Sequence, residues 1–361
     1  MNILKYIFEL LFRLIPFPVK PKLIKVGNPD PSSPVLVTTN YDLTVRRVRK
    51  ALKDFDCYLL VAPAKGINVW CGAGGGHFNA DSIVSIIKTS KIEDLVDLRK
   101  LIIPQLCANG ILIKDIKEKT GWDATFGPAH IRDLPRFVSN KYKKTSDMNV
   151  VKFDFGQRLE MGLAMAANFL FVLAIILVIL ARNILLPALI ISFLLCMVVS
   201  LGAFMIPGRS WLRKGLIVGL ISSGIFLVYS LVIGDYSVGT SIRSVLGIFA
   251  LSIAVELDLP AWTPLWRCNL TGGSRSKVEL YVDKDRCIGC TLCWQVCPTG
   301  VFEVKGDKSE AVYVERCETC TACVKQCPTG AVVTDMKVNP SCCACPTCKV
   351  IETVSKRNKV S

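Results

Sequence analysis

Two cysteine motifs near the C-terminal end of the chain have the spacing that binds iron–sulfur clusters. Residues 287–300 read CIGCTLCWQVCPTG, and residues 317–330 read CETCTACVKQCPTG. Each copy is C-x2-C-x2-C-x3-C-P, the pattern of a bacterial two-cluster ferredoxin, in which the fourth cysteine of one copy ligates the cluster of the other. The spacing therefore predicts one [4Fe–4S] cluster held by Cys287, Cys290, Cys293 and Cys327, and a second held by Cys317, Cys320, Cys323 and Cys297.

The alternative for this repeat is a pair of zinc sites, but the proline after each fourth cysteine and the doubled pattern favour clusters, which carry single electrons. A further run, NPSCCACPTC, contains four more thiols: Cys342, Cys343, Cys345 and Cys348. Adjacent thiols close only a strained disulfide ring, so we interpret these cysteines as soft-metal ligands. A small zinc knot or a redox pair is the alternative for this tail.

A third segment suited to chemistry is INVWCGAGGGHFNADS, residues 67–82. Cys71 is followed by four glycines within five residues, and then by a helix that we expect Asn79 to cap. Glycines let a flat ligand approach the backbone closely, and a thiol near a helix N-terminus has a lowered pKa. A nucleotide-binding loop is disfavoured, because His77 stands where that pattern needs its third glycine. The remaining alternative is a buried cysteine in an ordinary turn.

Composition favours a membrane protein with metal sites in a reducing compartment. The chain has 361 residues, 51% of them hydrophobic, and a mean hydropathy of +0.43, which excludes the disordered and fibrous classes. Its net charge is +15, yet we find no nucleic-acid motif. Twelve of the 17 cysteines lie between residues 287 and 348, so they form sites rather than a disulfide scaffold. Three isolated cysteines are predicted to be buried small hydrophobic residues: Cys57, Cys107 and Cys196.

The region around Cys71 alternates between strand and helix patterns. We predict strands at 34–39, 57–62, 100–106 and 122–127, and helices at 43–53, 81–90 and 113–121. Strands separated by helices favour a parallel sheet with crossover connections, which is a Rossmann-like arrangement.

Residues 161–255 contain only six charged side chains, so this region is predicted to span a membrane. Four spans fit, at about 161–181, 184–206, 215–234 and 243–259. Basic residues are concentrated in 207–214 and before the first span, which places both termini and the soluble domains in the cytoplasm. The first 18 residues form an amphipathic pattern that we expect to lie on the membrane surface, with packing on the next domain as the alternative.

These patterns predict a multidomain membrane protein. Its segments are an interfacial helix at 1–20, an α/β domain at 21–140, a linker at 141–158, four or five transmembrane helices at 159–260, a linker at 261–277, an α+β two-cluster ferredoxin domain at 278–336 and a cysteine-rich metal-binding tail at 337–361.

The stretch NVWCGAGGGHF resembles the cap-helix motif of HgcA, the corrinoid protein of the mercury-methylating pair, which reads N-V/I-W-C-A-A/G-G-K-G-x-F. Residues 34–44 (PVLVTTNYDLT) and 120–135 (TGWDATFGPAHIRDLP) also resemble this family and, more distantly, the corrinoid domain of the corrinoid iron–sulfur protein of the acetyl-CoA pathway. The C-terminal part is similar to HgcB, a two-cluster ferredoxin with a tail of cysteines. The chain thus resembles a natural fusion of the two. It departs from the motif at Gly72, where alanine is usual, and at Gly75, where the motif has lysine.

The resemblance implies a corrinoid (cobalamin) site in which Cys71 is the lower axial ligand of cobalt and the catalytic residue. The implied cofactor-binding residues are Thr38, Asn68, Val69, Trp70, Cys71, Gly72, Ala73 and Gly74. It further implies anaerobic transfer of methyl from cob(III)alamin to an acceptor such as Hg(II), with the fused ferredoxin returning cobalt to Co(I) and the tail cysteines delivering Hg(II). The implied partners are membrane lipid, a methyl donor protein or methyl-folate carrier, an electron donor and, in a homo-oligomer, further copies of the chain.

Three other functions stay open from the residues. One is a membrane-anchored iron–sulfur electron carrier that needs no cobalt. Another is a corrinoid methyl carrier of one-carbon metabolism with no mercury activity. The last is a metal-handling protein built on the tail cysteines.

Overall fold

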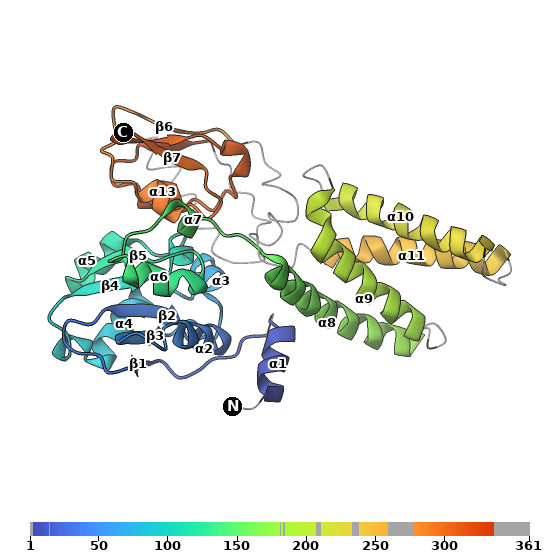
Figure 1. Cartoon of the computed structure of the whole chain (residues 1–361), viewed down its shortest axis with the longest axis horizontal. Helices are drawn as coiled ribbons and strands as arrows, with labels where there is room; N and C mark the ends of the chain where they lie inside the picture. The colour runs from blue at the N-terminus through green and yellow to red at the C-terminus, as the bar shows by residue number, and fades with distance from the viewer. Residues whose placement is uncertain are drawn as a thin grey trace. The chain divides into compact units, whose positions relative to one another are not determined.

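The computed structural model describes residues 3–13, 15–180, 182, 185–206, 211–232, 238–258 and 278–335 (Figure 1). The chain divides into two compact units, one of Met1–Ile15 with Lys152–Arg275 and the other of Pro16–Val151 with Ser276–Ser361. The second unit contains both the α/β domain and the cysteine repeat. The tail cysteines Cys342, Cys343, Cys345 and Cys348 lie outside the described residues, as does the predicted linker at 261–277.

The α/β domain is built on a mixed five-stranded sheet of order β1-β3-β2-β4-β5. Its strands are β1 (Lys22–Val26), β2 (Val35–Thr39), β3 (Cys57–Ala62), β4 (Lys100–Ile103) and β5 (Asp123–Phe126). The four predicted strands are confirmed as a parallel set, whereas β1 is an antiparallel edge strand that the pattern missed. Lysines interrupt the apolar run of β1, so it lacks the signature of a buried strand.

Helices cover both faces of the sheet. They are α2 (Asp42–Ala51), α3 (Val69–Gly74), α4 (Ala80–Ser90), α5 (Ile113–Thr120), α6 (Leu134–Ser139) and α7 (Ser146–Asn149). Successive residues of β2 point to opposite faces, so Val35 and Val37 enter one apolar core with α4 and α5. Leu36 enters the other core with α2 and α6.

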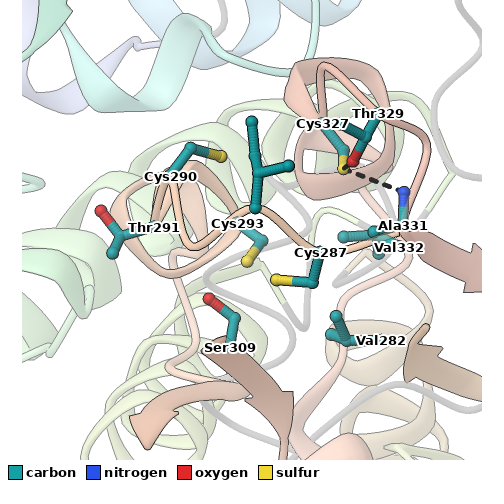
Figure 2. A pocket seen from close by; sticks show the side chains of 11 residues that line it. Val282, Cys287, Cys290, Thr291, Cys293, Ser309, Cys327, Thr329, Ala331 and Val332 are labelled. Carbon is teal, nitrogen blue, oxygen red and sulfur yellow. Dashed lines mark hydrogen bonds between the residues drawn. The ribbon is translucent and has the colours of Figure 1, made fainter. Parts of the chain in front are cut away.

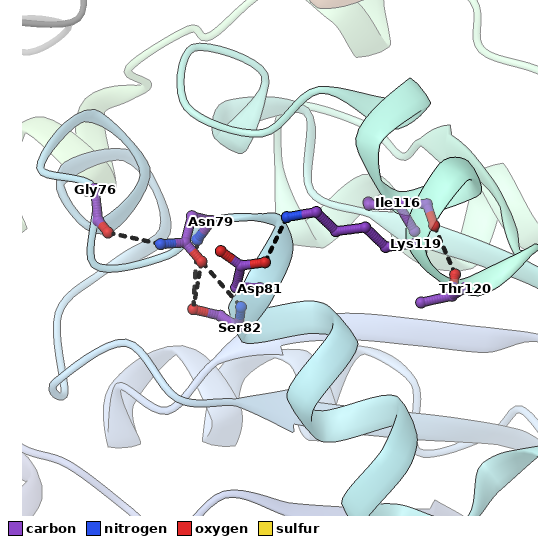
Figure 3. Close-up of polar contacts among 7 residues, drawn as sticks. All are labelled: Gly76, Asn79, Asp81, Ser82, Ile116, Lys119 and Thr120. Atoms are coloured by element: carbon purple, nitrogen blue, oxygen red, sulfur yellow. Dashed lines mark hydrogen bonds and ion pairs between the residues drawn. The ribbon is translucent and has the colours of Figure 1, made fainter.

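The predicted N-terminus of α4 is confirmed. The Asn79 side chain accepts a hydrogen bond from Ser82 N at 2.9 Å and donates to Gly76 O at 3.0 Å (Figure 3). This capping box satisfies backbone donors that a helix start leaves unpaired. Next to it, Lys119 of α5 pairs with Asp81 at 2.5 Å, which joins the two helices on the surface.

One predicted strand is too long. The pattern placed a strand at 100–106, but β4 ends at Ile103 and a single 3-10 turn, η2 (Gln105–Cys107), follows. Pro104 explains the difference, because proline has no backbone N–H to continue the ladder. Residues 108–111 follow this turn as a loop, which contacts the segment that carries Cys71.

The cysteine-repeat module, residues 278–335, contains two antiparallel strand pairs and two short helices. The pairs are β6 (Leu280–Val282) with β9 (Val332–Thr334), and β7 (Phe302–Lys305) with β8 (Lys308–Ala311); the helices are α13 (Leu292–Val296) and α14 (Ala322–Gln326). Only Ala311 of the apolar run 311–314 belongs to a strand. A tight turn with Gly306 at φ +63° pairs Lys305 with Lys308, so β8 begins before that run.

The other unit contains four long apolar helices, α8 (Phe155–Leu180), α9 (Leu185–Gly202), α10 (Trp211–Val232) and α11 (Val238–Asp258). Each is long and apolar enough to cross a membrane, which confirms the four predicted spans as candidates. The N-terminal helix α1 (Ile3–Leu11) packs against α8: Asn168 donates to Leu11 O at 2.8 Å, and Arg13 pairs with Glu160. Ile3 and Leu4 of this helix are exposed and could contact lipid. The membrane-surface role of the helix stays a prediction.

Candidate functional site

The loop that leads to Cys71 is held by Asn40, directly after β2. Asn40 is 5% exposed, and its side-chain oxygen accepts hydrogen bonds from Ala64 N at 2.8 Å and Gly66 N at 2.9 Å. Its amide donates to Val19 O at 2.9 Å. All of these bonds fix backbone, so Asn40 is a positioning residue that the sequence analysis missed. An asparagine at the carboxyl end of a buried strand is the signal that could have indicated it.

Cys71 lies on the short helix α3, which begins after Asn68. The Asn68 side chain accepts a hydrogen bond from Cys71 N at 2.9 Å and so caps the helix at the residue that carries the thiol. Cys71 is half-buried, while Gly72 and Ala73 are buried beneath it. A β-carbon on Gly72 would lie 3.3 Å from the Phe78 side chain, so this position is tight. Val69 and Trp70 are half-buried on the same turn.

Two threonine hydroxyls at the carboxyl end of β2 have no hydrogen-bond partner among the described residues. Thr38 and Thr39 are 1% and 0% exposed. Helix α3 contacts β2, the strand that carries both threonines. Leaving a buried hydroxyl unpaired costs about 1–3 kcal/mol, and such groups at the carboxyl edge of an α/β sheet commonly meet a ligand. The residues present therefore fit a polar cofactor at this edge, as the corrinoid interpretation requires.

The loop after η2 packs closely against α3. A β-carbon added at Gly110 would lie 2.1 Å from the Ala73 carbonyl oxygen, and one added at Gly74 would lie 3.2 Å from Asn109 Nδ2. Only glycine permits this approach of loop and helix. Ala108 and Ile111 are buried in the core, while Asn109 is half-buried and Gly110 is exposed between them, so the loop is anchored at both ends.

Four cysteines converge on one cavity in the cysteine-repeat module. Figure 2 shows the side chains that line it, and they include Cys287, Cys290, Cys293 and Cys327. Three come from the first copy of the motif and the fourth from the second, which is the predicted crossed arrangement of side chains. Cys327 Sγ accepts a hydrogen bond from Ala331 N at 3.2 Å, a contact that favours a metal-bound thiolate.

The second cysteine set has the same crossed relationship and is more deeply buried. Burial raises the pKa of Cys317 to about 11, and the nearby Cys297 contributes to the shift. Burial likewise raises the pKa of Cys323, again with Cys297 among its neighbours. Backbone N–H groups point at two of these sulfurs, from Val301 to Cys297 at 3.3 Å and from Thr319 to Cys317 at 3.4 Å. Buried thiols that resist ionisation alone are suited to a metal centre that replaces the proton.

The isolated cysteines are buried, as predicted. Cys57, Cys107 and Cys196 are at most 1% exposed. Burial raises the pKa of Cys57 to about 11, so this thiol is not a reactive thiolate. Cys71 is therefore distinct in the α/β domain as a cysteine with partial exposure.

Two known families match the two parts of this site. The family described as CO dehydrogenase/acetyl-CoA synthase delta subunit matches residues 13–138, and the 4Fe-4S dicluster domain family matches residues 279–328. The α/β domain, called the corrinoid-protein domain below, is therefore similar to corrinoid iron–sulfur proteins, and the cysteine-repeat module, called the dicluster domain below, matches an iron–sulfur dicluster family. Cys71 lies inside the first match, and both cysteine motifs lie in or at the edge of the second.

Curated relatives match the corrinoid-protein domain. The acetyl-CoA decarbonylase/synthase complex subunit gamma of Methanopyrus kandleri is 38% identical over 128 residues, 35% of this chain and 27% of the relative. The corresponding subunit of Methanocaldococcus jannaschii is 34% identical over 131 residues, 36% of this chain and 26% of the relative. The corrinoid/iron–sulfur protein large subunit of Moorella thermoacetica is 30% identical over 126 residues, 34% of this chain and 28% of the relative. The chain thus spans about a quarter of the length of the curated relatives it matches.

Proposed function

We propose that the chain is a membrane-anchored corrinoid methyl-transfer protein with its own iron–sulfur reductase. The observation that carries the proposal is the placement of Cys71. Its thiol is half-exposed on a capped helix that packs against the strand bearing the unpaired hydroxyls of Thr38 and Thr39. The match of this domain to corrinoid iron–sulfur proteins supports a corrinoid as the ligand.

In this proposal the Cys71 thiolate would hold the cobalt of a corrinoid, and the residues around it keep the thiol in place. Asn68 fixes the backbone of Cys71, while Gly72 and Gly74 let Phe78 and Asn109 lie close to the cap helix. Val69 and Trp70 would shield the ligand from water, and a threonine hydroxyl would be available to a polar edge of the corrinoid. When bound, a corrinoid would supply methyl-transfer chemistry, which a thiolate from Cys71 would favour towards an electrophilic acceptor.

The two crossed cysteine sets would hold two [4Fe–4S] clusters, which would supply single electrons for reduction of the corrinoid. The first set lines a common cavity, and the sulfurs of both sets accept backbone hydrogen bonds. Among the described residues, no group of three or more His, Cys, Asp and Glu side chains is spaced for a single metal ion. The crossed set of cysteines around one cavity and the match to the dicluster family support clusters over zinc sites.

The methyl acceptor has two candidates. The HgcA-like motif around Cys71 favours Hg(II) as the acceptor substrate, with the tail thiols delivering it. The relatives of the corrinoid-protein domain are named as subunits of acetyl-CoA decarbonylase/synthase complexes, which favours an acceptor of one-carbon metabolism. A methyl-folate carrier or methyl donor protein would supply the methyl group in both cases.

The membrane helices give this chemistry a location. In our proposal α8, α9, α10 and α11 cross the cytoplasmic membrane, and both soluble domains face the cytoplasm. An even number of spans with cytoplasmic termini keeps both cysteine sets in a reducing compartment, where thiol-ligated clusters persist.

Anaerobic purification with cobalamin supplied tests the proposal directly. We expect about one cobalt per chain and an optical spectrum of a thiolate-ligated corrinoid. Cys71→Ala should lose that spectrum and methyl transfer to either acceptor while keeping its iron and sulfide. Cys57→Ala removes a buried thiol of the same domain and serves as the matched control. Wild-type protein with full iron content and no cobalt would contradict the proposal and support the alternative of a membrane-anchored iron–sulfur electron carrier.

A further inference from the structure

The dicluster domain touches the corrinoid-protein domain at the loop that supports Cys71. Residues 108–111 lie between α3 on one side and α14 on the other. The Gln326 amide donates to two loop carbonyls, Ala108 O at 2.9 Å and Ile111 O at 2.6 Å. Lys325 Nζ donates to the carbonyl between them, Asn109 O, at 2.6 Å. Two neighbouring side chains of α14 thus occupy three carbonyls of one short loop.

The two Gln326 bonds are buried and the Lys325 bond is partly buried, so together they define the position of the loop. Gln326 is 5% exposed, and Ala108 and Ile111 are at most 1% exposed. A buried carbonyl that loses its donor has no water molecule to replace that donor. The conformation of the loop therefore depends on α14. The apolar core of the corrinoid-protein domain also continues into the dicluster domain without a break.

The opposite side of the loop holds the cap helix. The Gly110 backbone packs directly on the Ala73 carbonyl, two residues from Cys71, and Asn109 lies against Gly74. A displacement of the loop therefore moves the helix that carries the thiol. A second anchor lies at the start of the loop, where Lys144 Nζ donates to Gln295 O of α13 at 2.5 Å and to Gln105 Oε1 at 3.1 Å.

The two copies of the cysteine motif differ at the positions that make this contact. The motifs read CVKQCP in the second copy and CWQVCP in the first, so Lys325 and Gln326 correspond to Gln295 and Val296. Cluster binding alone accepts either pair, because both copies share the same cysteines and helix. The lysine and glutamine of the second copy are therefore additional to what the motif requires.

We propose that α14 is a clamp on loop 108–111, and that Lys325 and Gln326 are positioning residues that hold the cap helix ready for its ligand. Folding of the dicluster domain then pre-forms the Cys71 site within the same chain. The purpose of the clamp rests on the proposed corrinoid role of Cys71, whereas its contacts do not. The same clamp keeps the dicluster domain on its own corrinoid-protein domain rather than on that of a second chain.

The double variant Lys325→Gln with Gln326→Val tests the clamp, because it gives the second copy the residues that the first copy already uses. Iron and sulfide content checks that the clusters still assemble. In full-length protein without cobalamin, we expect amide hydrogen exchange in residues 69–76 and 105–111 to rise by roughly tenfold. Lys308→Gln is the matched control, since Lys308 also donates to a carbonyl, Lys284 O, but within the dicluster domain.

Titration with hydroxocobalamin gives a second readout. We expect the double variant to bind cobalamin roughly tenfold more weakly and to show a smaller fraction of the thiolate-ligated spectrum. The single variant Lys325→Arg, which keeps a donor at this position, should lose less of both. Unchanged exchange at residues 69–76 in an iron-replete double variant would overturn the clamp. If exchange rises but wild-type protein does not bind cobalamin, the clamp stands and the proposed corrinoid function falls.

Discussion

Gly110 and Ala73 are in direct backbone contact, although they come from different elements of the corrinoid-protein domain. A β-carbon on Gly110 would lie 2.1 Å from the Ala73 carbonyl oxygen and 2.6 Å from its carbonyl carbon. Real atoms do not approach that closely, so any larger residue at 110 must push the loop and the cap helix apart. Cys71 is two residues away from Ala73 and moves with it.

Gly110→Ala is therefore expected to weaken cobalamin binding by roughly tenfold or more, since a steric clash that displaces the backbone costs about 1–3 kcal/mol. Spectral titration of the anaerobic protein measures the effect. Gly247→Ala is the control, because a β-carbon there meets nothing within 4 Å. Equal affinities for the two variants would show that the cap helix does not depend on this contact.

The unpaired threonines give a prediction that separates stability from binding. Thr38→Val removes a buried hydroxyl that has no partner among the described residues, so the ligand-free protein should unfold at the same temperature or higher. If the hydroxyl serves the corrinoid, cobalamin affinity should fall by roughly tenfold.

Thr39→Val is the comparison for this experiment. Thr39 is equally buried and unpaired, but neighbouring residues of a strand point to opposite faces of the sheet. A loss of cobalamin affinity confined to Thr39→Val would show that Thr39, not Thr38, contacts the cofactor. No loss in either variant would show that neither hydroxyl of β2 contacts it.

Much of this fold could be predicted because its elements carry local signals. Strand β3 was predicted with the bounds it has, since CYLLVA is a continuous apolar run, and the Asn79 cap was visible three residues before Ser82. Strand β1 could not be predicted in the same way. Its two lysines face solvent at a sheet edge, and only pairing with β3 makes it a strand.

The candidate site likewise contains residues that local sequence patterns predict and residues that they do not. The cysteine spacing predicted which sulfurs would come together around one cavity, because the motif wraps its own ligands locally. The support beneath Cys71 was not visible. Asn40, Gly110 and Gln326 are far from Cys71 in sequence and act on backbone carbonyls and amides, which have no residue-type signature.

The crossed cysteine sets predict which cluster each variant loses. Cys327 belongs to the second motif but lines the cavity of Cys287, Cys290 and Cys293. We expect Cys327→Ala to lose roughly half of the iron and the signal of the first-motif cluster, with the second-motif cluster retained. Low-temperature electron paramagnetic resonance of the reduced protein distinguishes the two.

Cys297→Ala is the reciprocal variant, and it should lose the cluster held by Cys317, Cys320 and Cys323. Loss of the same signal in both variants would contradict the crossed arrangement. Loss of all iron in both would show that the two clusters assemble only together.

Lys144 predicts a pH dependence of stability. Burial of its ammonium group lowers the pKa of Lys144 to about 7 in the folded chain, from the ordinary lysine value of 10.5. Between these two values the unfolded chain binds more protons than the folded chain, so folding becomes more favourable as pH rises. The slope is at most about 1.4 kcal/mol per pH unit, and it disappears below pH 7, where both states are protonated.

Lys144→Met should abolish this dependence, because methionine fills a similar space without a titrating group. Thermal unfolding of the detergent-solubilised protein between pH 7 and pH 9 measures it, and the midpoint should rise with pH in the wild type more steeply than in the variant. Lys143→Met changes an exposed neighbour and should keep the wild-type slope. Parallel slopes for wild type and Lys144→Met would mean that Lys144 stays charged between Gln105 and Gln295, with its two oxygen acceptors compensating for its burial.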